Sequence, residues 1–232
     1  AKLGMEFDFI NDSFHAQLDI FVNVAGGIVQ GRASGGRAGW GVIHIAPDEW
    51  YMHMGTPTDR LGLKMGVGGF SIETGGYFMM GDRIPGSPPP PPEVAEILGV
   101  DVDKLDYMRD LNALGEGKGF AFGADFKIDT GDMNFLILYA RFQAGVGFDI
   151  MLKDYGEARC VGSSEPIGID GWYANGQSYA YLQGELGINI KLFFIRKKIP
   201  IIKGGAAVLL QGKGPNPFWF RGYVGGYYNL LG

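Results

Sequence analysis

The feature that most constrains this chain is an alternation of apolar and polar residues that continues over unusually long stretches. Every even-numbered residue from Leu136 to Leu152 is apolar. A period of two residues is the signature of a β-strand whose two faces differ chemically. If straight, this stretch would be more than about 50 Å long, so we expect Gly145 and Gly147 to bend it or split it.

The alternation recurs along most of the chain and predicts a mainly β fold. We expect an antiparallel meander of long hairpins, arranged as a sandwich or as an open or closed barrel. The chain would be a single all-β domain or part of a larger one. Within it we expect a first β meander over residues 1–84 and a second set of long strands over 116–232.

Residues 85–115 interrupt the pattern and predict a proline-rich, two-helix insertion. The run Pro88–Pro92 cannot lie inside a sheet, because proline has no N–H to donate to a neighbouring strand. A first helix is expected from Glu93 to Leu98, ended by a glycine, and a second from Val102 to Leu114. Asp101 is the expected N-cap of the second helix.

The clearest hairpin spans residues 42–54, with Pro47-Asp48 as its turn. This register places apolar residues on one face, which we assign to the core: Ile43, Ile45, Trp50, Met52 and Met54. The other face carries His44, His53 and Glu49. Two imidazoles and a carboxylate could hold Zn²⁺, but a further ligand would have to come from elsewhere. We therefore favour a solvated polar face and expect no metal and no cofactor.

Composition and charge narrow the function classes. The formal net charge is −5 and the isoelectric point is near 5.2, which argues against a nucleic-acid partner. The one cysteine, Cys160, cannot form an intrachain disulfide. We find no motif that brings together a nucleophile, an acid and a base, so we expect no enzymatic activity and no catalytic residue.

The apolar strand faces need cover, and two kinds are open. They could pack on a second sheet, which we favour here, or they could face lipid in an outer-membrane barrel. Both ends of the chain lie in strand-like sequence, at residues 3–10 and 218–231, which suggests a piece of a longer protein. We expect these strands to pair with the rest of that protein, with a second copy or with another envelope protein.

Several stretches are distinctive, notably the ones at 45–57, 81–112, 167–176 and 218–222. They resemble a segment of very large, multi-module envelope proteins of Bacteroidetes, some described as TANFOR-domain proteins. The resemblance implies a secreted or outer-membrane-associated structural protein and transfers no catalytic residue.

We therefore expect a structural or interaction module of a bacterial cell-surface or outer-membrane-associated protein. One alternative is an outer-membrane barrel or pore component. A second is a glycan-binding module that would use an aromatic surface of Trp172, Tyr173, Trp219 and Tyr223. Aromatic rings at these positions also suit packing within the fold.

Overall fold

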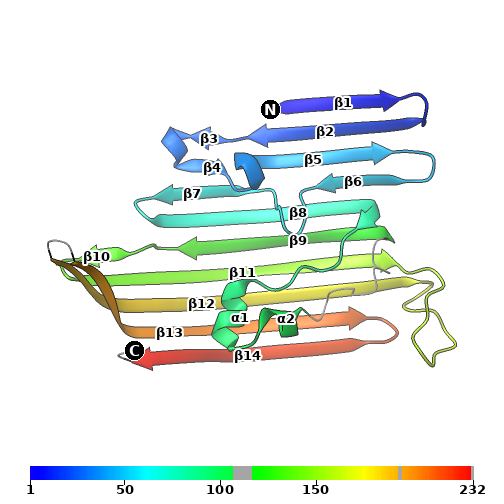
Figure 1. Cartoon of the computed structure of the whole chain (residues 1–232). Helices are drawn as coiled ribbons and strands as arrows, with labels where there is room; N and C mark the ends of the chain where they lie inside the picture. The colour runs from blue at the N-terminus through cyan, green and yellow to red at the C-terminus, as the bar shows by residue number, and fades with distance from the viewer. Residues whose placement is uncertain (107–116, 193–194, 231–232) are drawn as a thin grey trace.

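The computed structural model describes residues 1–106, 117–192 and 195–230 of the chain. It is a mainly β, antiparallel structure, as the alternation predicts. All strands belong to one 14-stranded sheet that is not closed into a barrel (Figure 1). The described residues form no second sheet, so they are not a sandwich. They form one open sheet, which is neither sandwiched nor closed into a barrel.

The first half of the sheet contains shorter strands. They are β1 (Lys2–Asp8), β2 (Ser13–Phe21), β3 (Asn23–Val24), β4 (Val29–Gly31), β5 (Arg37–Ile45), β6 (Trp50–Met54), β7 (Leu63–Val67) and β8 (Phe70–Ile84). Single 3₁₀ turns, η1 (Ala25–Gly27) and η2 (Ser34–Gly36), link the small strands. Strand β8 pairs with both β6 and β7 along one edge and with β9 along the other, so it joins the two halves.

The second half contains the long strands. They are β9 (Gly117–Asp129), β10 (Met133–Phe135), β11 (Leu138–Asp154), β12 (Trp172–Leu192), β13 (Ile195–Gly214) and β14 (Trp219–Leu230). The main strand order is β1-β2-β5-β6-β8-β9-β11-β12-β13-β14, and every pairing is antiparallel. Strand β11 is continuous, so Gly145 and Gly147 do not split it.

The proline-rich insertion leaves the end of β8 and crosses one face of the sheet (Figure 1). Helix α1 (Pro92–Leu98) ends at Gly99, whose left-handed φ of 64° favours glycine. Helix α2 (Val102–Leu105) begins at Asp101, whose side chain accepts a hydrogen bond from the Asp103 N–H. It is shorter than expected, because Asp106 already has a non-helical conformation; residues 107–114 of the expected helix lie outside the described residues.

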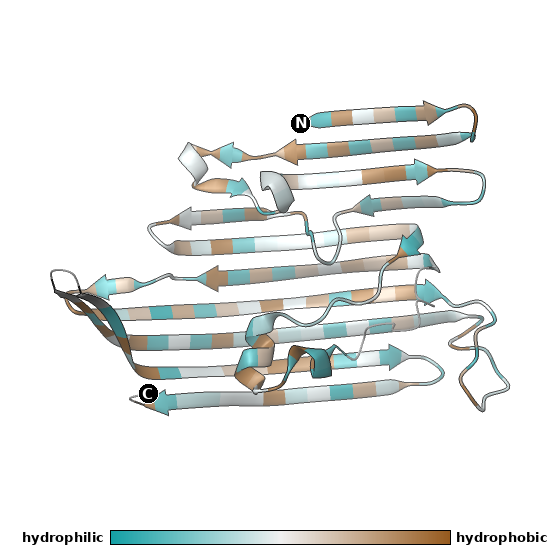
Figure 2. Ribbon diagram, in the orientation of Figure 1, coloured by the Kyte–Doolittle hydropathy of each residue, from teal (hydrophilic) through white to brown (hydrophobic). Residues whose placement is uncertain are grey.

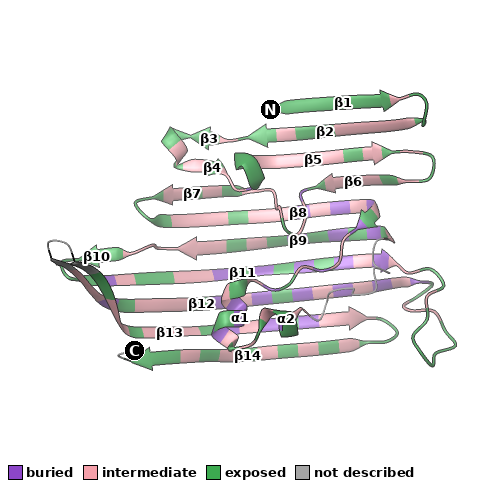
Figure 3. Cartoon of the chain, in the orientation of Figure 1, coloured by how far each residue is buried: buried purple, intermediate pink, exposed green. Residues whose placement is uncertain are grey.

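The insertion builds the main buried cluster. Residues of α1 and α2 pack on β12 and β13, and the cluster consists of Val94, Ala95, Ile97, Leu105, Tyr179, Tyr181, Ala207 and Leu209. A smaller buried cluster forms where β8, β9 and β11 meet. Figure 3 shows the buried residues concentrated in the long strands that this segment crosses.

The hairpin register is confirmed but its assignment to the core is wrong. Ala46 and Glu49 exchange backbone hydrogen bonds of 2.7 and 3.4 Å across the Pro47-Asp48 turn, and Ile45 pairs with Trp50. Yet the side chains of Ile45 and Trp50 are 51% and 43% exposed. The physical reason is that the insertion covers the opposite face of the sheet, and nothing in the described residues covers this one.

Candidate functional site

The two faces of the sheet are chemically distinct, and we name them by what they carry. The polar face is the one crossed by α1 and α2. The apolar face is the opposite one, to which Ile45 and Trp50 belong. Figure 2 shows hydrophilic and hydrophobic residues alternating along several strands, such as β1 and β11, which produces this division.

A ladder of polar side chains runs across the polar face, which we call the polar ladder: Tyr77, Asp149, Gln177, Gln211 and Arg221. Backbone pairing aligns these residues in one row from β8 to β14, with Gly123 of β9 between the first two. The Tyr77 hydroxyl donates to Asp149 Oδ1 at 2.9 Å, and Gln177 Nε2 donates to Asp149 Oδ2 at 3.1 Å. Gln211 Nε2 donates to Gln177 Oε1 at 3.3 Å, and Arg221 Nη2 donates to Gln211 Oε1 at 2.9 Å.

The ladder is buried and depends on a glycine. Asp149 is 1% exposed and Gln211 is 2% exposed. A Cβ atom at Gly123 would lie 2.6 Å from the Tyr77 ring and 2.7 Å from Asp149 Oδ1. The tyrosine therefore reaches Asp149 across β9 only because position 123 has no side chain.

Arginines from the loops neutralise the acidic side chains of this region. Arg60 Nη2 lies 2.6 Å from Asp149 Oδ1, and Arg60 Nη1 lies 3.1 Å from Asp125 Oδ1. Arg32 Nη1 lies 2.6 Å from the other Asp125 oxygen. Buried charges are stable when paired in this way, so the cluster is a compensated network and not a set of free carboxylates.

Tyrosines lie over glycines at several further places on this face. The rings of Tyr139, Tyr179 and Tyr181 occupy the space that side chains at Gly187, Gly147 and Gly145 would fill, with closest approaches of 2.6, 2.4 and 2.5 Å. Glycines in a strand weaken it unless something packs over them. Here the facing tyrosines supply that packing, which explains how β11 stays continuous through Gly145 and Gly147.

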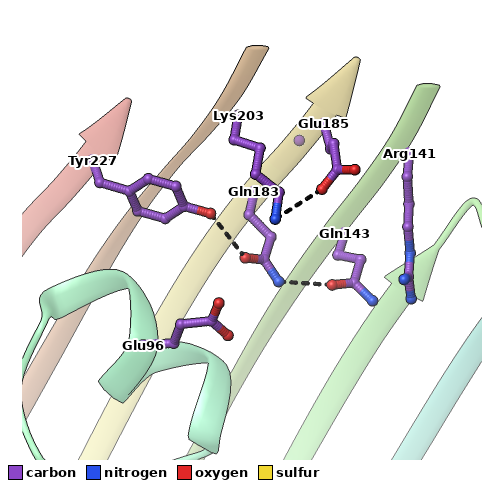
Figure 4. Close-up of a pocket in the computed structure, with 8 residues that line it drawn as sticks. Glu96, Arg141, Gln143, Gln183, Glu185, Lys203 and Tyr227 are labelled. Atoms are coloured by element: carbon purple, nitrogen blue, oxygen red, sulfur yellow. Dashed lines mark hydrogen bonds and ion pairs between the residues drawn. The ribbon is translucent and has the colours of Figure 1, made fainter. Parts of the chain in front are cut away.

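A second polar row borders a pocket of about 230 Å³ beside α1 (Figure 4). Gln183 Nε2 donates to Gln143 Oε1 at 2.7 Å, and Lys203 Nζ lies 3.0 Å from Glu185 Oε2. Tyr227 and Glu96 also line the pocket, the latter from α1 (Figure 4). Arg141 of this pocket pairs with Asp129, at 2.6 Å. Most of the charges that line the pocket thus already have partners.

The insertion is held to the polar face by specific contacts. Gln177 Nε2 also donates to the Pro88 carbonyl oxygen at 2.9 Å, and Gln211 Nε2 donates to the Leu105 carbonyl oxygen at 2.9 Å. Glu93 of α1 accepts a hydrogen bond from Lys127 of β9. Burial is the largest single influence and raises the pKa of Glu93, but the hydrogen bond from Lys127, a backbone hydrogen bond and the Lys127 charge together outweigh it and hold the pKa of the carboxyl below its ordinary value.

The apolar face carries no charged side chain in the central part of the described strands. One backbone-aligned row crosses the sheet from β1 to β14 and consists of Leu3, Leu18, Gly41, Met54, Phe78, Phe122, Ile150, Gly176, Gly212 and Phe220. Large hydrophobic side chains on this face are exposed, for example Val224 at 84%. An apolar patch of this extent marks an interaction surface.

The histidines form an aromatic row and not a metal site in the described residues. The ring of Tyr51 stacks on His44 at 5.1 Å and on His53 at 4.7 Å, so it separates the two imidazoles. Glu49 Oε2 lies 3.9 Å from His44 Nε2. Across the described chain, no three His, Cys, Asp or Glu side chains gather in a way that could hold a metal ion.

The four candidate aromatic residues do not form one surface. Trp172 lies on the apolar face, where its ring stacks on Phe120 at 6.4 Å. Tyr173 is on the polar face, buried, and its hydroxyl donates to the Pro217 carbonyl oxygen at 2.8 Å. Trp219 and Tyr223 are also on the polar face, with the Arg221 guanidinium over both rings at 5.4 and 4.9 Å.

Sequence reasoning missed the polar ladder, although its members were visible as polar residues at one parity of the long strands. Cys160 is a free thiol in an exposed loop. Among the described residues, no helix is both long and apolar enough to cross a membrane. Comparison with known proteins gives no match to a family model, to a curated protein or to a solved structure.

Proposed function

We propose that this chain is a wall segment of an outer-membrane β-barrel, with its apolar face against lipid and its polar face lining the interior. This is the alternative raised from the sequence, an outer-membrane barrel or pore component, in place of the structural or interaction module that the sequence favours. The observation that carries the proposal is the uncharged apolar face, set against a polar face of ion pairs and hydrogen bonds. Outward apolar and inward polar residues alternate in this way in membrane barrels.

The dimensions of the apolar face support this assignment. Along β11 the uncharged band runs from Leu138 to Leu152, which at about 3.3 Å per residue is roughly 46 Å. With the usual strand tilt of about 40–45°, its height becomes roughly 33–35 Å, comparable with the thickness of about 30 Å of the hydrocarbon core. Asp154 and Lys118 follow at the end of the band, where water and headgroups would begin.

The edges of the sheet set a further requirement. Strands β1 and β14 each pair on one side only within the described residues. Hydrocarbon cannot satisfy the free N–H and C=O groups of an edge strand. The proposal therefore includes additional strands, from a longer polypeptide or from a second copy, that complete the barrel. The polar ladder has a structural role in it, and no catalytic activity is proposed.

The four tryptophans allow a direct test. Trp50 and Trp172 lie on the apolar face, whereas Trp219 lies on the polar face and Trp40 there donates its Nε1–H to the Asp59 carbonyl oxygen at 3.1 Å. Variants that keep one tryptophan and carry phenylalanine at the other three would be reconstituted into vesicles containing lipids with brominated acyl chains.

Bromine quenches tryptophan fluorescence at short range. Trp172 pairs with Asp154 at the end of the apolar band, and Trp50 lies at the same level of the sheet. We therefore expect strong quenching in the Trp50-only and Trp172-only variants when the bromine atoms are near the headgroup end of the acyl chains, and weak quenching in the matched Trp40-only and Trp219-only variants. Equal quenching on both faces, or a folded protein that stays in the aqueous phase without detergent, would refute the proposal.

A further inference from the structure

We infer that the polar face carries a docking groove for an extended, proline-rich polypeptide, and that residues 85–105 of the chain itself occupy the groove in this structure. The partner proposed is a proline-rich segment of another polypeptide. This inference does not depend on what the apolar face contacts.

The first argument is the way in which the occupant is recognised. Gln177 and Gln211 both donate to main-chain carbonyl oxygens of the segment, those of Pro88 and Leu105. A hydrogen bond of this kind recognises the backbone of the segment and not a particular side chain. Pro88–Pro92 have no N–H groups, so they lie against the sheet without burying an unpaired donor. Other residue types would each bring a donor that needs a partner.

The second argument is the floor of the groove. Tyr179 and Tyr181 line a cavity of about 340 Å³ together with Pro88–Pro92. The rings of Tyr179 and Tyr181 pack directly over Gly147 and Gly145. Polyproline II segments typically dock in grooves lined by aromatic side chains, and they lose little conformational entropy on binding. The cavity also shows that the present occupant leaves part of the groove unfilled.

The third argument is that the recognising groups are also held by other residues of the sheet. Asp149 holds Gln177, and Arg221 holds Gln211, through the polar ladder. By contrast, the fit of the occupant is incomplete: the hydroxyl of Ser87, within the segment, is buried without a hydrogen-bond partner in the described residues. A pre-organised groove with an imperfect internal occupant can exchange it for an external one.

The test uses the full chain with residues 86–105 replaced by a Gly/Ser linker of equal length. The probe is a fluorescent synthetic peptide of residues 85–105, and binding is followed by anisotropy. We expect saturable binding to the replaced variant, and at least about tenfold weaker binding to the intact chain, because its tethered segment competes at high effective concentration. A peptide with alanine at 88–92 should bind at least about tenfold more weakly than the native peptide.

Two outcomes would overturn the inference. One is no binding to the replaced variant although circular dichroism shows its sheet intact; the other is equal binding of the native and alanine peptides. If the replaced variant does not fold, a photo-crosslinking residue at Thr58, which lines the cavity, is used in the intact chain with excess peptide. Labelling by the native peptide but not by the alanine peptide supports the groove, and labelling by neither or by both contradicts it.

Discussion

Substituting Gly123 with alanine tests whether the polar ladder depends on the open space above β9. The new Cβ would lie 2.6 Å from the Tyr77 ring, 2.7 Å from Asp149 Oδ1 and 2.6 Å from the Phe148 carbonyl oxygen. All three are closer than real Cβ atoms approach their neighbours, and the last belongs to the backbone and cannot rotate away.

The expected loss of stability has two parts. Forcing a methyl group into a packed site costs about 1–3 kcal/mol. If Tyr77 is pushed off Asp149, a buried acceptor loses a donor, which costs about another 1–3 kcal/mol. Against this, replacing glycine by alanine restricts the unfolded chain and stabilises the fold by about 0.4–1 kcal/mol. We therefore expect Gly123→Ala to lower the free energy of unfolding by about 1–6 kcal/mol.

Gly176→Ala is the matched control. It lies in the same central part of the sheet but on the apolar face, where its Cβ would have neighbours only at 3.7 and 3.8 Å. We expect no loss of stability, or a small gain, in urea unfolding followed by circular dichroism in the same detergent or lipid. If both alanine variants unfold at the same urea concentration, the glycine does not have the role that we assign to it.

Three further predictions follow from other parts of the molecule. Val146→Arg, in the middle of the apolar band, should reduce stability in the membrane by about 2–4 kcal/mol and lower recovery in the membrane fraction, whereas Gln143→Arg on the polar face should leave that recovery unchanged. Because the folded-state pKa of Glu93 is lowered, its ion pair stabilises the docked insertion above the ordinary carboxyl pKa, and this contribution disappears as the pH falls through the lowered value. Limited proteolysis of residues 85–105 should therefore accelerate in that acidic range, and Glu93→Gln should remove this pH dependence. Replacing His44 and His53 together with alanine should leave the zinc content of the purified protein unchanged by elemental analysis, and a loss of stoichiometric zinc would show that our view of the aromatic row is wrong.

Much of the fold could be predicted from the sequence because alternation is a local signal. The parity of the residues around Pro47-Asp48 was enough to fix the hairpin register, which the Ile45–Trp50 pair confirms. The proline run and Asp101 were enough to place an insertion with two helices. What the apolar face packs against could not be predicted in this way, since the same alternation suits a face in a protein core and a face against lipid.

The candidate site could not be predicted for a different reason. The polar ladder requires the relative register of β8, β9, β11, β12, β13 and β14, and no local pattern specifies how far one strand is shifted against another. The tyrosine–glycine pairs have the same origin: Tyr77 and Gly123 are far apart in sequence and meet only through strand pairing. Residue type alone marks the histidines and tryptophans as candidates, and it carries no information about the face of the sheet that each one occupies.

The order of the long strands has a consequence for how such a protein can vary in size. From β8 to β14 the main path places each strand beside its predecessor in the chain, with only the short β10 outside it. Every hairpin therefore extends the existing rows on both faces by the same repeating step. Duplicating or deleting a hairpin would widen or narrow the sheet in units of two strands, keep every strand antiparallel to its neighbour, and preserve the polar and apolar sides of all the others.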